Sequence, residues 1–275
     1  MNGFSIIDSY NETDEENRLQ SSNARKVEFL TTIDALKPYM KKNMSVLDCG
    51  CGVGIYSLFY AKLGLQLTAL DLVPRHIKRL KELASSEGVN IKSIVGNATD
   101  LSIFEDQSFD VTLCMGPLYH LVSEEDQTAC IKECIRVTKN SGLIVFSYIS
   151  PFSVFPCVIR GDAARVSKTL VNKILIDRKI SGDDDLCFWT DNNYYSPEDI
   201  ENLLEECGLS VVDHLATDGQ SIAFQNVVNA LDNERLEVWM EYHRMICRER
   251  SLLGASNHGL VLARKKAYYA DTTRE

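Results

Sequence analysis

Three closely spaced glycines follow an acidic residue in the segment VLDCGCGVG, and this is the part of the sequence best suited to hold a ligand. Asp48 ends a short apolar run, and Gly50, Gly52 and Gly54 come directly after it. Glycine lets the backbone turn tightly and approach a ligand without a Cβ in the way. A helix is predicted to begin after this loop, and its unpaired N–H groups favour a carboxylate or a phosphate. The segment therefore predicts a loop that binds a ligand with an anionic group.

A second acid points to the rest of that ligand. Asp71 ends the next strand-like run, about twenty residues beyond the loop, where a carboxylate can accept hydrogen bonds from both hydroxyls of a ribose. The arrangement is shared with nicotinamide-dependent dehydrogenases, which use the pattern G-x-G-x-x-G. Here the third glycine comes one residue early, and Ile55 stands in its place. The sequence thus indicates a nucleoside and disfavours a nicotinamide, while a tight turn without a ligand stays open for the loop taken alone.

Two later segments carry a resemblance to a known family. VGNATDL (95–101) follows a third strand-like run, and SFDVTLCMGPLYHL (108–121) contains a fourth. Together with a G-x-G-x-G loop behind an acid, they resemble the class I S-adenosylmethionine-dependent methyltransferases that act on small molecules. The resemblance covers residues 24–150 well and residues 194–265 more loosely. Asn97 stands where the family has an acid, but its amide oxygen can still accept a hydrogen bond from an amino group.

The resemblance implies S-adenosyl-L-methionine as the cofactor and S-adenosyl-L-homocysteine as the product. It also implies that the turn at Asn97 meets the adenine and that the segment after the fourth strand lines the cofactor. Tyr10 and Arg18, on the N-terminal segment, are weaker candidates; Arg18 suits the cofactor carboxylate, and a solvated arm is the alternative. The expected cofactor-binding residues are Asp48, Gly50, Gly52, Gly54, Tyr56, Asp71, Leu72, Asn97, Ala98, Met115, Gly116, Tyr10 and Arg18.

Methyl transfer from a sulfonium requires chiefly that donor and acceptor be held in line at about 3–3.5 Å. A base is needed only for an acceptor that carries a proton near neutral pH. His120 is the predicted base or substrate orienter, because an ordinary imidazole titrates near that pH; packing, or a hydrogen bond to the cofactor, is the alternative. The expected substrate-pocket residues are Tyr119, His120, Trp189 and His258, and no metal site is expected. The remaining histidines, His76, His214 and His243, are expected to be structural.

The chain around these motifs alternates between strand-like and helix-like patterns, which predicts a parallel sheet covered on both faces. We expect an α/β fold, with a seven-stranded, mostly parallel sheet of the Rossmann-like methyltransferase type and helical lid insertions. The predicted strands cover residues 45–49, 66–72, 91–96, 109–115, 143–149, 209–215 and 258–265. The main predicted helices cover residues 24–40, 55–64, 74–88, 124–140 and 196–208.

The strand–helix alternation is interrupted by two segments between the late strands, 151–193 and 225–256. They are the predicted lids, because ligands bind at the carboxyl ends of such strands. The first is expected to contain a helix over 163–179, preceded by an apolar loop that Pro151 and Pro156 interrupt. Gly142 is expected just past the end of the helix before it. The predicted domains are an N-terminal arm (1–23), a methyltransferase domain (24–265) and a C-terminal tail (266–275).

Composition bounds the possible functions. The chain has 275 residues, of which 45% are hydrophobic and 25% charged, so disordered and fibrous classes are excluded. Its net charge of -10 argues against a nucleic-acid substrate. Nine cysteines without paired C-x-x-C units are expected to be reduced thiols.

We therefore expect a cytoplasmic enzyme, a monomer or homodimer, that methylates a small molecule, with no nucleic-acid or membrane partner. A catalytically inactive module that binds S-adenosylmethionine or another nucleoside is the alternative.

Overall fold

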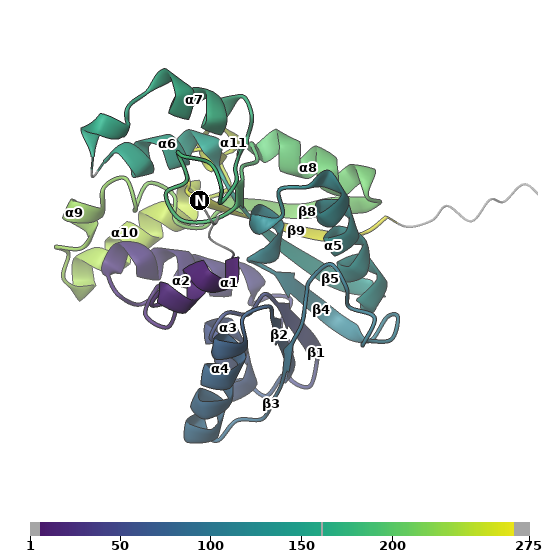
Figure 1. Cartoon of the computed structure of the whole chain (residues 1–275). Coiled ribbons are helices and arrows are strands. Elements are labelled where there is room, and N and C mark those ends of the chain that lie inside the picture. The colour runs from purple at the N-terminus through teal and green to yellow at the C-terminus, as the bar shows by residue number, and fades with distance from the viewer. Residues whose placement is uncertain (1–5, 161, 267–275) are drawn as a thin grey trace, which may run out of the picture.

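The computed structural model describes residues 6–160 and 162–266, and one seven-stranded sheet runs through its centre (Figure 1). Its order is β3-β2-β1-β4-β5-β9-β8, in which β9 is antiparallel to both neighbours and the other pairs are parallel. The predicted α/β fold with a mostly parallel sheet is confirmed. The strands are β1 (Ser45–Cys49), β2 (Gln66–Asp71), β3 (Ile91–Val95), β4 (Phe109–Cys114), β5 (Thr138–Ile149), β8 (Leu209–Ala216) and β9 (His258–Lys265).

Helices cover both faces of the sheet because successive strand residues point to opposite sides. Val46 packs on one face and Leu47 on the other. The first face is covered by α2 (Asn23–Leu36), α3 (Ile55–Lys62) and α4 (Pro74–Glu87), with α10 (Asn233–Ile246) against α2. The second face is covered by α5 (Glu124–Val137) and α8 (Pro197–Glu206).

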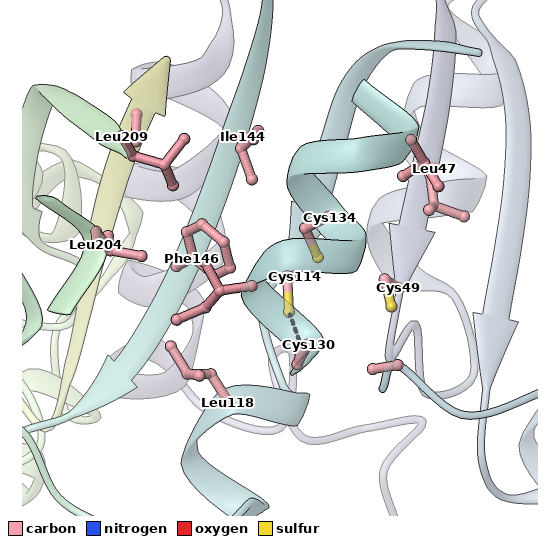
Figure 2. Close-up of a cluster of buried hydrophobic side chains, with 14 of the residues drawn as sticks. Leu47, Cys49, Cys114, Leu118, Cys130, Cys134, Ile144, Phe146, Leu204 and Leu209 are labelled. Atoms are coloured by element: carbon pink, nitrogen blue, oxygen red, sulfur yellow. Dashed lines mark hydrogen bonds between the residues drawn. The ribbon is translucent and has the colours of Figure 1, made fainter. Parts of the chain in front are cut away.

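Four buried cysteines belong to the core beneath α5 (Figure 2). Cys49 ends β1, Cys114 ends β4, and Cys130 and Cys134 lie one turn apart on α5. The sulfurs of Cys114 and Cys130 are 3.7 Å apart. All nine cysteines are free thiols, and these four fill the core as small apolar side chains beside Leu47 and other apolar residues.

Three local predictions are wrong. Gly142 lies inside β5, because α5 ends at Val137 and the strand begins at the next residue. The apolar loop is instead a helix, α6 (Pro151–Ile159), in which Pro151 takes the first position, where no N–H partner is needed. The helix over 163–179 is shorter: α7 (Lys168–Leu175) starts where the Ser167 side chain accepts from Leu170 N, and β6 (Lys179–Ile180) then pairs with β7 (Asn192–Asn193).

The N-terminal segment and the two insertions gather near the carboxyl ends of the central strands. The arm carries a helix, α1 (Ile6–Glu12), and the second insertion carries α9 (Gln225–Val228), α10 and α11 (Arg250–Leu253). The tail beyond residue 266 lies outside the described residues, and the proposed domain bounds stay predictions. No helix in the described ranges has the length and apolar character to cross a bilayer.

Candidate active site

A cavity opens at the carboxyl ends of β1, β2, β3 and β4, where the predicted motifs converge. We call it the edge chamber. Its walls come from the arm, the glycine loop, the ends of β2 and β3, and the short 3-10 helix Pro117–His120 that follows β4. Its lining includes Tyr10, Glu15, Arg18, Asp48, Gly50, Gly52, Tyr56, Asp71, Leu72, His76, Asn97, Ala98, Met115, Gly116, Tyr119 and His120.

The glycines of the loop serve different purposes. A Cβ on Gly50 would lie 2.4 Å from Cδ of Pro117, and one on Gly54 would lie 2.4 Å from Cδ1 of Leu80. Both positions therefore require glycine for packing within the protein. Gly52, with φ +55, faces Glu15 of the arm, whose Cγ would be 3.4 Å from an added Cβ. Of the expected cofactor-binding residues, Gly54 alone lies outside the lining of the edge chamber.

Asp71 fixes the loop to the second strand. Its Oδ2 accepts from Gly52 N at 2.7 Å, and its Oδ1 accepts from Val73 N at 2.9 Å. Nδ1 of His76 lies 3.1 Å from the same Oδ1 and must donate, because a carboxylate only accepts. The lone pair of His76 is then on Nε2, a buried atom with no partner among the described residues. A carboxylate held by two backbone N–H groups and an imidazole thus lies at the chamber, where its remaining lone pairs can accept from hydroxyl donors.

His76 was expected to be structural, and the sequence holds a weak signal for its place in the chamber. It follows the strand-end acid by five positions, in the first turn of α4, which Pro74 begins. Glu15, Glu28 and Asp218, described below, are further residues that the motifs did not indicate.

His120 lies at the chamber with both ring nitrogens engaged. Nδ1 is 2.8 Å from the carbonyl oxygen of Asp191, and Nε2 is 2.8 Å from the hydroxyl of Tyr10. A carbonyl only accepts, so Nδ1 donates and Nε2 accepts from Tyr10. Burial lowers the pKa of His120 to about 4, so the ring is neutral at pH 7. To act as a base, His120 would first have to release Tyr10; its catalytic role stays a prediction.

Charged side chains of the arm and of α2 pair with one another at the edge chamber, and a further carboxylate lies at the end of β1. Arg18 lies between two carboxylates, with Nε 2.8 Å from Oε1 of Glu15 and Nη1 3.0 Å from Oε2 of Glu28. Its predicted contact with the cofactor carboxylate stays a prediction. Asp48 is buried at the end of β1, and its Oδ2 accepts from Ser57 Oγ at 2.6 Å. Burial raises the pKa of Asp48 to about 7.

A second cavity adjoins the first, and we call it the lid chamber. The two share Tyr10, Glu15, Arg18 and Tyr119 as a common wall. Trp189 and His258 line the lid chamber, as their predicted substrate role requires, whereas His120 lines the edge chamber only. The rest of the lid chamber comes largely from the first insertion. Its apolar lining includes Ile149, Val154, Cys157, Val158, Phe188, Tyr194 and Ile222, and its polar lining includes Arg25, Arg160, Asn192 and Asn257.

A sheet with one reversed strand near its edge, and a glycine-lined chamber at the carboxyl ends of its first strands, define a Rossmann-like methyltransferase fold. A family model described as a methyltransferase domain matches residues 46–142. A ubiquinone biosynthesis O-methyltransferase of Xanthomonas oryzae pv. oryzae (strain PXO99A) is 33% identical over 164 residues, which are 58% of this chain and 66% of that protein. The matched part is thus slightly under two thirds of that relative's length.

Solved structures resemble the fold over most of the chain. The PH0226 protein of Pyrococcus horikoshii OT3 gives a TM-score of 0.57 at 20% identity, covering 92% of this chain and 100% of that one. A 1,6-didemethyltoxoflavin-N1-methyltransferase of Burkholderia thailandensis, bound to 1,6-didemethyltoxoflavin and S-adenosylhomocysteine, gives 0.57 at 14% identity, covering 95% and 85%. The chain is therefore similar to S-adenosylmethionine-dependent methyltransferases, in sequence over the region around residues 46–142 and in fold over most of its length.

Proposed function

We propose that this protein is a class I S-adenosylmethionine-dependent methyltransferase that holds S-adenosylmethionine in the edge chamber and methylates a small molecule held in the lid chamber. The observation that carries the proposal is the common wall of the two cavities, formed by Tyr10, Glu15, Arg18 and Tyr119. Two adjoining cavities allow a donor and an acceptor to be bound separately and still meet, which is the main requirement of in-line transfer.

The residues of the edge chamber fit the cofactor. When bound, S-adenosylmethionine supplies an electrophilic methyl group on a sulfonium sulfur. The carboxylate of Asp71, oriented by His76, is an acceptor suited to the ribose hydroxyls. Asn97 and Ala98, beyond β3, are suited to the adenine, and Asp48, once ionised, is suited to the positive charge. Gly54 supports the loop by its packing against α4.

The lid chamber favours a small acceptor with an apolar body. Aliphatic and aromatic side chains such as Val158 and Trp189 exclude water, and a few polar groups such as Asn257 can orient a ligand. A hydroxyl acceptor agrees with the name of the Xanthomonas relative, an O-methyltransferase. A cytoplasmic location, a monomeric or homodimeric state and the absence of a nucleic-acid or membrane partner remain predictions.

Two measurements test the proposal. Calorimetry with S-adenosylhomocysteine measures cofactor binding, and transfer of tritium from methyl-labelled S-adenosylmethionine into a metabolite extract measures turnover. The variant Val158→Trp fills the lid chamber, so we expect it to keep the affinity for S-adenosylhomocysteine and to lose transfer. Binding without transfer to any extract fraction by the unaltered protein would favour the inactive module instead.

A further inference from the structure

We infer that His258, oriented by Asp218, accepts the proton of the methyl acceptor, so that the acceptor is a protic nucleophile such as a hydroxyl. The inference rests on the proposed function and names the class of acceptor that this site serves. It depends on contacts at the start of β9 and just after β8, where the second insertion leaves the sheet and returns to it.

Asp218 is a fully buried carboxylate held by the chain around it. Its Oδ1 accepts from Ser256 Oγ at 2.6 Å and from Asn257 N at 2.8 Å. Its Oδ2 lies 3.0 Å from Nδ1 of His258. Nδ2 of Asn257 lies 3.2 Å from the same nitrogen and can only donate, so it would need a lone pair on Nδ1. The carboxylate is closer and charged, and its hydrogen bond from Nδ1 is the stronger of the two alternatives. His258 therefore carries its hydrogen on Nδ1 and its lone pair on Nε2.

Nε2 of His258 is available to a ligand. No residue in the described part of the chain hydrogen-bonds to it, and it is not among the fully enclosed polar atoms that lack a partner. His258 lines the lid chamber. Its ring centroid is 6.2 Å from that of Tyr119, which belongs to the common wall of the two cavities. The His258 ring thus lies near the place where the two chambers meet.

The surroundings favour proton uptake. Oε2 of Glu28 lies 3.5 Å from Nδ1 of His258, so two carboxylates face one ring. Burial and the charge of Arg18 oppose protonation, but Glu28 and Asp218 outweigh them, and the pKa of His258 is raised above its ordinary value. His120, from the 3-10 helix after β4, stays neutral because burial lowers its pKa to about 4, and the charge of His258 adds a smaller effect in the same direction.

Glu28, Asp218 and His258 have ligand atoms within 4.8 Å of one another, as a divalent cation would require. Their hydrogen bonds favour a proton over a metal ion. Glu28 is already paired with Arg18, and both oxygens of Asp218 accept from the chain, so a cation would have to displace these donors.

In the proposed methyl transfer, the cofactor sulfur keeps the electron pair of the broken bond and His258 takes the acceptor's proton. As the acceptor atom bonds to the methyl carbon, the carbon–sulfur electron pair stays on sulfur, and the acceptor proton passes to Nε2 of His258 and later to water. Asp218 and Glu28 stabilise the imidazolium that forms. An acceptor without a proton, such as a thioether, would make no use of this arrangement.

The test uses His258→Gln and Asp218→Asn, with His214→Gln as a matched control. His214 is also a buried histidine paired with a carboxylate, 2.6 Å from Glu201, but it lies on β8 away from both chambers. Tritium transfer into a metabolite extract is measured from pH 5.5 to 9, along with the affinity for S-adenosylhomocysteine. We expect His258→Gln to lower transfer at least about 100-fold with unchanged affinity, the usual size of a general-base contribution.

Asp218→Asn should lower transfer less and move the acidic limb of the pH profile to lower pH, because His258 loses a negative neighbour. His214→Gln should leave transfer unchanged. A folded His258→Gln protein with the transfer rate of the unaltered enzyme overturns the inference, whereas no transfer by the unaltered enzyme overturns the proposed function. Nitrogen-15 NMR of the histidines adds a readout independent of turnover: hydrogen on Nε2 of His258 at pH 9, in place of Nδ1, also overturns it.

Discussion

Replacing Asp71 by alanine should weaken both the fold and cofactor binding, and the two effects can be measured separately. The carboxylate accepts from two backbone N–H groups and from Nδ1 of His76, and the residue is only 7% exposed. Hydrogen bonds to a charged group contribute about 1.5–3 kcal/mol each, and buried donors left without a partner cost a similar amount. Because such losses are not additive, we expect the free energy of unfolding to fall by about 3 kcal/mol, or about 6–12 °C in melting temperature.

Cofactor affinity should fall by at least about tenfold, or 1.4 kcal/mol, because the acceptor for the ribose hydroxyls is lost and the loop at Gly52 is released. Calorimetry with S-adenosylhomocysteine measures this at a temperature where the variant is folded. Asp110→Ala is the matched control: Asp110 accepts from Ser45 at 2.8 and 2.9 Å and pairs with Lys139, but at the opposite, amino end of the strands. It should lower the melting temperature without changing the affinity. A folded Asp71→Ala protein with normal affinity refutes the placement of the cofactor.

Three further results follow from the edge chamber. His76→Ala should weaken binding of S-adenosylhomocysteine by about tenfold in calorimetry, since Asp71 loses the hydrogen bond that helps to orient its carboxylate; an unchanged affinity would contradict this orienting role. Asp48, with a pKa of about 7, is protonated below that pH, so the affinity for cationic S-adenosylmethionine should fall about tenfold per pH unit below pH 7, with Asp48→Asn flattening the profile. Gly54→Ala should lower the free energy of unfolding by about 1–3 kcal/mol in urea, because Gly54 has φ +82 and an added Cβ would clash with Leu80. A loss of affinity with normal stability would contradict this packing role.

The sheet was predictable because its strands are short apolar runs between turn signals. β1 and β9 were predicted with their observed bounds, and β2, β3 and β4 to within a residue at one end. Ligand-facing residues at strand ends were predictable for the same reason: parallel strands bring their carboxyl ends to one edge, so residues such as Asp71 and Asn97 must lie near one another.

The insertions were harder because long-range contacts decide them. α6 forms despite two prolines, since Pro151 begins the helix and the apolar side chains of the segment pack into the lid region. The pairing of His258 with Asp218 joins residues 40 positions apart. His258 was expected at the pocket, but nothing in the sequence indicated Asp218 as its partner, and the return of the second insertion to the sheet brings the two together.

The matched family region and the acceptor site are nearly separate parts of the chain, which limits what similarity says about the substrate. The methyltransferase domain model covers residues 46–142. Among the residues that line the lid chamber, Tyr119 alone lies inside that range; the others come from the arm, from α2 and from segments after residue 148. The cofactor half can therefore stay similar while the acceptor half changes entirely. The acceptor must be sought from the chemistry of the lid chamber, which combines apolar walls and a few charged side chains with an imidazole nitrogen free to take a proton.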